Sequence, residues 1–422
     1  MFFKKIIENN IIPTILILLI PIFAIFSIFA LEFNLFLLTV LFLLLIIIKK
    51  EFFYFKNNFF YLFIIFYFYI LVNFSIQSDK STLSVIFYFR YLLYILAISY
   101  FFLHVQKLFN NFLKTIFFLL IILNLDSTFQ FIFDFNIIGM PLEEAWRVSS
   151  FFGDELILGS FIFRLLPFLF FLLLCDNLYI NKKIIFSLIF FSIFVIFLSG
   201  ERSSLLLTFL YCFLLSIIFY KKEYSNIYKY FIALFLILIT LTLFFSKDLR
   251  FRYYEQPLND LLNTNYDPNK HTLANIEKKN NIYFFSGQHE NYLITGYRMF
   301  KDNIIFGVGP RNYRISCKDK KYNLNSFSCS THPHNFYIQI FAETGLIGAL
   351  FLVITYFWLL FSFFKKKNLK SKSLKINYIL ISFYLSALWP VIPSGNFFNN
   401  WLSILTYLPL SILFYKKFKI EK

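Results

Sequence analysis

The chain has 422 residues, of which 59% are hydrophobic and 23% aromatic, and its mean hydropathy is +0.68. This composition excludes an ordinary soluble domain, because apolar runs of about 18 residues or more are typical of helices that cross a membrane. The net charge of +17 does not indicate nucleic-acid binding, since most lysines stand in short clusters between apolar runs, where they set membrane topology.

Apolar runs recur along nearly the whole chain and predict an all-α fold, a polytopic membrane bundle of about 12 transmembrane helices. Strict alternation of polar and apolar residues is absent, which argues against membrane β-strands. The first run follows two lysines and has no small-residue cleavage site, so we expect an uncleaved first helix. The predicted spans are 11–29, 31–48, 58–75, 82–103, 113–133, 156–175, 184–199, 204–220, 230–246, 335–363, 376–393 and 400–415.

The lysine clusters predict which side of the membrane each loop faces. With Lys4 and Lys5 inside, nearly all lysines of the short loops fall on the cytoplasmic side, as the positive-inside rule requires. One large outer segment then remains between spans 9 and 10. The predicted organisation has three parts: helices 1–9 in residues 1–246, an outer loop domain in 247–334, and helices 10–12 in 335–422.

The nine arginines are distributed differently from the lysines, since on this topology none is cytoplasmic. In a chain that otherwise uses Lys, a retained Arg indicates a need for the planar guanidinium, which binds phosphate or carboxylate through two hydrogen bonds. We therefore predict an anion site at the outer membrane face. Its candidate members are Arg147, Arg202, Arg250, Arg252, Arg298, Arg311 and Arg314.

The remaining arginines, Arg90 and Arg164, fall within predicted spans. An arginine inside a span requires a partner or a wet cavity. Asp126 and Gln130 share one face of the fifth span and are the expected partners. A structural ion pair and a contact with substrate both remain open for the two arginines.

Among the outer arginines, Arg202 stands in a short hairpin, LSGERSSLL, and is held at the membrane surface by the spans on either side. It is therefore predicted to bind a ligand. Arg147 precedes the sixth span, and Arg298 opens a stretch, 297–314, that reads as a helix end followed by a Gly-Pro turn. The glycines of that stretch are a weak signal for a phosphate-binding loop, since neither a strand nor a Gly-Lys-Ser/Thr sequence accompanies them.

Two of the five histidines, His332 and His334, stand in the sequence THPHNFYIQ, where a polar segment becomes apolar. Pro333 suits the first turn of a helix, so we expect His334 to project from the first turn of span 10. A helix N-terminus disfavours the imidazolium and attracts anions, which would leave a neutral base beside an anion site. The alternatives are interfacial anchoring, and metal binding that lacks a third ligand at a suitable spacing.

Cys317 and Cys329 enclose 11 residues of the predicted outer segment. An oxidising compartment favours a disulfide between them, and two free thiols in a loop are the alternative. Cys175 and Cys212 fall in apolar spans and are expected to be packing residues.

The sequence HPHNFYIQIFAETGLIGALF, preceded by FGVGPRNYR and a long outer loop, resembles the O-antigen ligase and polymerase superfamily. The hairpin SGERSS resembles the Ser-Gly-x-Arg loop of that family, and RVSSFFGDELILGS resembles its Arg-containing loop. The resemblance covers roughly residues 140–355. The GDE sequence departs from the Gly-x-Pro-Asn of many ligases, which leaves the ligase subtype open.

The resemblance implies a metal-independent, cofactor-free glycosyltransferase of the bacterial inner membrane. Its donor would be a glycan on undecaprenyl diphosphate, and its acceptor a hydroxyl of lipid A-core, at the periplasmic face. His334 would be the base and Arg147, Arg202 and Arg298 would hold the diphosphate. Secondary candidates are Arg311, Arg314, His332 and Asn335.

Two other functions remain as alternatives. A polymerase would use the same donor and join lipid-linked repeats of a glycan. A polysaccharide transporter or flippase would also have about 12 spans, but it would more often show two similar halves and would not need a long outer segment with a histidine at its exit.

Overall fold

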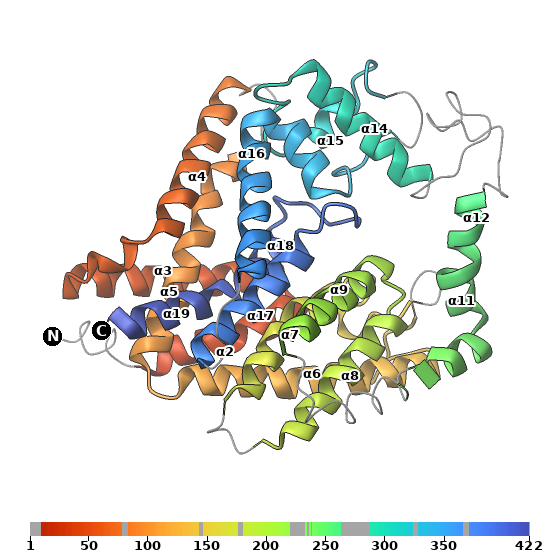
Figure 1. Ribbon diagram of the computed structural model, residues 1–422, viewed down its shortest axis with the longest axis horizontal. Helices are drawn as coiled ribbons and strands as arrows, with labels where there is room; N and C mark the ends of the chain where they lie inside the picture. The colour runs from red at the N-terminus through yellow and green to blue at the C-terminus, as the bar shows by residue number, and fades with distance from the viewer. Residues whose placement is uncertain are drawn as a thin grey trace.

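The computed structural model describes residues 10–77, 83–142, 147–175, 180–219, 233, 236–237, 239–262, 287–323, 328–365 and 371–421. These residues form helices and no β-strand, with one isolated bridge between Phe135 and Pro141. The α-helices (Figure 1) are α2 (Ile11–Phe26), α3 (Ile28–Lys49), α4 (Asn58–Ile76), α5 (Arg90–His104), α6 (Leu108–Phe133), α7 (Leu158–Leu173), α8 (Lys182–Leu198), α9 (Arg202–Phe219), α11 (Lys247–Arg250), α12 (Gln256–Leu262), α14 (Gly287–Asp302), α15 (Tyr313–Ser316), α16 (Phe336–Phe364), α17 (Lys372–Ala387), α18 (Asn400–Tyr407) and α19 (Leu410–Glu421).

Neighbouring helices pack in pairs to form the bundle: α2 with α3, α3 with α5, α5 with α19, α7 with α8, and α9 with α17. The core between them is aliphatic and aromatic. At one end of the bundle, α14 packs against α16, and Figure 1 shows α15 beside them. This end of the molecule holds the predicted histidine passage.

Five helices in the described ranges are long and apolar enough to cross a membrane, namely Ile28–Lys49, Asn58–Ile76, Leu83–His104, Leu108–Phe133 and Phe336–Phe364. Large apolar side chains face outward on them, including Phe29, Trp358 and Phe361 at 80%, 63% and 72% exposure. Contact of these apolar side chains with water is unfavourable, whereas contact with lipid is favourable. The prediction of an all-α, multi-pass membrane protein is thus supported, while the count of 12 spans stays a prediction.

The helices coincide with most predicted spans, and the two C-terminal spans differ from prediction. The span predicted at 376–393 ends at Ala387, because Pro390 and Pro393 cannot continue the helical hydrogen bonding. The span predicted at 400–415 is divided into α18 and α19 just before Pro409 for the same reason. The predicted span 230–246 lies partly outside the described residues.

Helix α16 is also not the continuous span that the sequence predicted. Gly345 interrupts it with φ 65° and ψ −165°, a conformation that only glycine adopts readily. The segment 304–309 crosses the break and binds the freed backbone groups. Val308 N–H donates to the carbonyl oxygen of Ala342 at 2.8 Å, and Leu346 N–H donates to that of Ile304 at 2.7 Å.

The end of α4 fixes this crossing from the other side. The hydroxyl of Tyr69 donates to the carbonyl oxygen of Thr344, and Asn73 Nδ2 donates to that of Phe306 at 2.5 Å. Gln77 Nε2 donates to the carbonyl oxygen of Gly307 at 3.3 Å. Helices α4, α14 and α16 are therefore joined at the break, which sets the position of the first part of α16.

We predict that Gly345→Ala lowers the free energy of unfolding by about 3 kcal/mol. A Cβ atom there would lie 2.2 Å from the carbonyl oxygen of Ile305, in addition to the backbone strain. Gly139→Ala is the matched control, since Gly139 also has a positive φ but has no atom within 4 Å of the added Cβ. We expect a loss of about 1 kcal/mol there. Thermal unfolding in detergent measures both, and equal losses would contradict the role of the crossing.

Candidate active site

The first turn of α16 begins at Phe336, three residues later than the sequence suggested. Asn335 is the N-cap, and its side-chain oxygen accepts hydrogen bonds from the N–H groups of Tyr337 and Ile338 at 3.0 and 3.1 Å. The prediction that Pro333 lies in the first turn is wrong, because Asn is a strong capping residue. His334 therefore precedes the helix, with a positive φ of 54°.

Residues 388–399, which follow α17, hold His334 and the start of α16 in place. Ser394 N–H donates to the carbonyl oxygen of His334 at 2.8 Å, and Asn335 Nδ2 donates to that of Pro390 at 2.7 Å. The Ser394 hydroxyl accepts from Phe336 N–H at 2.8 Å. The sequence prediction missed this segment by extending a span to 393. Its signal was WPVIPSGNFF, in which two prolines and a glycine indicate a loop.

Three rings gather around His334, those of His289, Tyr292 and His332, and we call the four residues together the histidine cluster. The ring centre of His334 lies 4.1 Å from that of His332, 5.2 Å from His289 and 5.4 Å from Tyr292. His289 and His334 line one small recess. His289 carried no spacing signal in the sequence, since the packing of α14 on α16 brings it there.

Both predicted histidines are neutral near pH 7. Burial, followed by the charge of neighbouring His334, lowers the pKa of His332 to about 3. Burial and the neighbouring His289 lower the pKa of His334 to about 4. The described part of the chain has no group of three residues placed to bind a metal ion. The two imidazoles are thus uncharged but weak bases, and an anion bound beside them would raise both pKa values.

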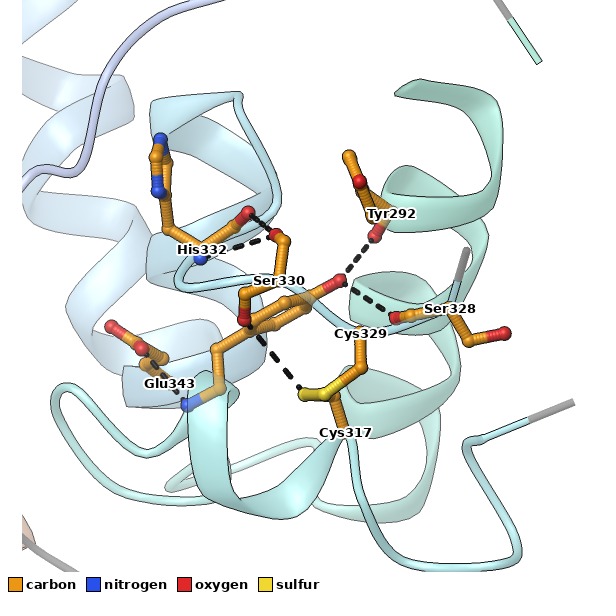
Figure 2. The surroundings of a disulfide bond; sticks show 8 residues. Tyr292, Cys317, Ser328, Cys329, Ser330, His332 and Glu343 are labelled. Carbon is orange, nitrogen blue, oxygen red and sulfur yellow. Dashed lines mark hydrogen bonds between the residues drawn. A yellow bond between two sulfur atoms is a disulfide. The ribbon is translucent and has the colours of Figure 1, made fainter. Parts of the chain in front are cut away.

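A disulfide between Cys317 and Cys329, with Cα atoms 5.1 Å apart, ties the histidine segment to α15. Figure 2 shows its surroundings, with His332 and Ser330 following Cys329 in the chain. The Tyr313 hydroxyl lies 3.1 Å from the carbonyl oxygen of Tyr292 and 3.4 Å from that of Ser328. One tyrosine thus links α14 to the segment that carries the histidines.

Glu343 connects the same network to α16. Its buried carboxylate accepts hydrogen bonds from Tyr313 N–H and from Gln339 Nε2, both at 3.0 Å. Gln339 Nε2 also donates to the side chain of Asn396 at 2.8 Å, in the segment after α17. The structure therefore places Glu343 at a junction of three segments.

A second group of charged residues surrounds the turn between α8 and α9, and we call it the arginine cluster: Arg147, Arg202, Arg252 and Glu201. Arg147 Nε donates to the carbonyl oxygen of Ser199 at 3.2 Å, and Arg252 Nε donates to that of Gly200 at 3.1 Å. Burial lowers the pKa of Arg147; Glu201 opposes this shift, whereas the charges of Arg252 and Arg202 add to it. The structure thus brings together three of the arginines predicted for the outer anion site, Arg147, Arg202 and Arg252.

Glu201 does not neutralise the cluster. Its carboxylate caps α7, accepting from the N–H groups of Gly159 and Ser160 at 2.6 and 3.0 Å, and from the Ser204 hydroxyl at 2.9 Å. Burial raises its pKa in spite of these hydrogen bonds and the nearby Arg147. Arg147, Arg202 and Arg252 lie close enough for their charges to interact, and the Glu201 carboxylate already accepts three other hydrogen bonds. The cluster therefore has excess positive charge and is suited to bind an anion.

The other predicted arginines occupy different places. Arg314 is the arginine whose charge acts on His332, and Arg311 Nη1 donates to the Ser84 hydroxyl at 2.6 Å. Arg298 lies on α14, and no hydrogen bond joins it to another residue of the described ranges. The structure therefore does not bring Arg298 into the arginine cluster by a direct contact.

The two arginines in predicted spans have partners that the sequence did not suggest. Arg90 forms an ion pair with Glu32 at 3.0 Å, and Arg164, which is 5% exposed, donates to the hydroxyls of Thr406 and Ser160. The prediction that Asp126 and Gln130 pair with them is wrong. Those two side chains instead bind the loop before α7, through residues 137–150.

Residues 187–353 match the family model described as O-antigen ligase. The match covers 167 of the 422 residues, and this part of the chain is similar to the O-antigen ligase family. The match confirms the predicted resemblance to the O-antigen ligase and polymerase superfamily, and it supports a glycosyltransferase-type enzyme in a membrane. No curated protein matches the chain. The matched residues include the turn between α8 and α9, the disulfide and the histidine cluster. Arg147 and residues 388–399 lie outside the match.

We predict that the free energy of unfolding falls as the pH drops from about 6.5 to about 4. The folded protein holds the pKa of His332 at about 3 and that of His334 at about 4, below the usual 6.5. The unfolded chain therefore binds more protons in this window, and stability is complete above pH 6.5 and lost below it. The expected slope is about 1.4 kcal/mol per histidine per pH unit.

Thermal unfolding of the detergent-solubilised protein at pH 7, 6, 5 and 4.5 measures this slope. A double variant, His332→Asn and His334→Asn, serves as the comparison and should unfold with a smaller dependence on pH. An identical slope in both proteins would show that other groups cause the acid sensitivity.

Proposed function

We propose that this protein is an O-antigen ligase-like glycosyltransferase. It would move a glycan from undecaprenyl diphosphate to an acceptor hydroxyl of lipid A-core, at the periplasmic face of the inner membrane. The observation that carries the proposal is a neutral His334, facing a recess, in a chain that also contains an arginine cluster with excess positive charge. The O-antigen ligase match supports this type of transfer.

The chemistry needs one base and one stabilised leaving group. The acceptor oxygen forms a bond to the anomeric carbon of the donor sugar, and its proton passes to a nitrogen of His334. The bond between that carbon and the diphosphate oxygen breaks, and undecaprenyl diphosphate leaves with the electron pair. Arg147 and Arg202, joined by Arg252, stabilise the charge on the departing diphosphate. The guanidinium groups supply positive charge, so the proposal requires no metal ion or cofactor.

Donor binding would also adjust the base. With a pKa of about 4, His334 is a weak base in the empty protein. A diphosphate in the site raises this pKa, because a nearby negative charge favours the imidazolium. His334 then becomes a stronger base only when donor is bound. Protonation of His334 in the absence of donor is therefore disfavoured. Arg298 remains a candidate for the diphosphate or the glycan beyond it.

The proposal includes the predicted topology of 12 spans with residues 247–334 as a periplasmic loop domain. The lysine-rich turn after α3, at Lys49 and Lys50, would then face the cytoplasm, and the turn between α8 and α9 would face the periplasm. Both clusters would lie on the side where the lipid-linked glycan is presented.

We predict that His334→Ala and Arg202→Lys each lower transfer by at least about 100-fold, since each removes an interaction made in the transition state. The measurement is transfer of glycan from purified lipid-linked donor to acceptor, beside a gel of cell-surface lipopolysaccharide. Arg250→Lys is the matched control, because Arg250 pairs with Glu255 at the surface. Near-normal transfer by either site variant, at wild-type protein level, would remove that residue from the mechanism.

A polymerase that joins lipid-linked repeats remains the alternative, since it uses the same donor. A deletion strain distinguishes the two. For a ligase, we expect all glycan to disappear from the lipid A-core. A single repeat remaining on the core would instead indicate a polymerase, and accumulation of donor on the cytoplasmic side would indicate a transporter.

A further inference from the structure

A second recess lies at the far end of α14 from the histidine cluster. The end of α4, the end of α14 and the turn after α15 surround it, and it opens to solvent with about 320 Å³ of space. Its polar lining comes from Gln77, Asn303, Ser316, Asp319, Lys321 and Tyr322.

The lining of this recess combines amides, hydroxyls, a carboxylate and an ammonium group. Asn303 Nδ2 donates to the Tyr322 hydroxyl at 3.4 Å, and Lys321 Nζ lies 4.5 Å from the centre of the Tyr322 ring. Ser316 is 1% exposed, and its hydroxyl has no hydrogen-bond partner in the described part of the chain. The Ser316 hydroxyl thus keeps unused hydrogen-bonding capacity beside the recess, which a polar ligand group could satisfy.

The charge of the recess excludes the diphosphate as its ligand. Lys321 pairs with Asp302 at 3.3 Å, so its positive charge is largely offset, and Asp319 adds a negative charge. The arginine cluster has the opposite balance. The recess instead offers amides, hydroxyls and single charges that are already paired. These groups suit the many hydroxyl groups of an uncharged ligand.

We propose that this recess is a saccharide subsite that binds sugar residues of the glycan away from the bond that is formed. The inference rests on the proposed function and deepens it by assigning a place to the glycan chain. Helix α14 separates His289 from Asp302 by about 20 Å, at 1.5 Å per residue. A donor with one sugar cannot reach from the reacting carbon to the recess, whereas a glycan of several sugars can.

The test is binding of a lipid-free oligosaccharide, namely several repeats released from the surface polysaccharide of the source organism, to the full-length protein in lipid nanodiscs. The double variant Ser316→Ala and Lys321→Gln should bind it at least 10-fold more weakly. Lys320→Gln is the matched control, because Lys320 is exposed and does not line the recess. His334→Ala should bind normally, since the recess lies apart from the histidine cluster. Thermal unfolding temperatures check that each variant is folded.

Wild-type binding by the double variant, or the absence of binding by wild-type protein, would overturn the subsite. Displacement of the oligosaccharide by inorganic diphosphate would also overturn it, because the ligand would then occupy the arginine cluster.

Failure of the proposed function gives a different result. The oligosaccharide would bind, and binding would require Ser316 and Lys321, while wild-type protein would transfer no glycan. If transfer occurs, the double variant should lose kcat/KM by about 10-fold with a donor of several repeats. It should lose none with undecaprenyl diphosphate carrying one sugar, and equal losses with both donors would contradict the subsite.

Discussion

The break in α16 at Gly345 is the constraint on which the rest of this end of the molecule depends. An uninterrupted helix would satisfy its own carbonyl groups and leave nothing for the segment 304–309 to bind. Because the helix is interrupted, that segment crosses it and carries α14 and α15 to fixed positions. The carboxylate of Glu343, two residues before the break, then holds Tyr313, which in turn contacts the histidine segment.

The arginine cluster and the histidine cluster differ in their contacts with the residues around them. In the arginine cluster, guanidinium groups donate to backbone carbonyl oxygens and keep part of their charge available for an anion. In the histidine cluster, crowding of three imidazoles and burial favour the uncharged form. In the proposed mechanism, the arginine cluster would attract the negatively charged donor, and the histidine cluster would respond to it. Neither property belongs to a single residue, since burial and repulsion between neighbouring groups both contribute.

Sequence reasoning found the residues whose signal is local. Arg202 was identifiable because its hairpin is too short to move, and Asn335 and His334 because they stand at a helix start. The errors concern tertiary structure. His289 reaches the histidine cluster through the packing of α14 on α16, and Glu32 pairs with Arg90 across 58 positions. Pro333 was preferred as the first helical residue because proline is common there, but the capping oxygen of Asn335 decides where α16 begins.

The dependence of His334 on residues 388–399 has a consequence for how the protein is made. Ser394 and Pro390, which hold the histidine and its neighbour, come after both α16 and α17 in the chain. A ribosome therefore has to synthesise both of these helices before the histidine can be fixed in its native geometry. A chain that ended after α16 would retain all residues that match the O-antigen ligase model. His334 and Asn335 would nevertheless lack their hydrogen bonds to Ser394 and Pro390. Residues outside the family match thus contribute to the candidate active site.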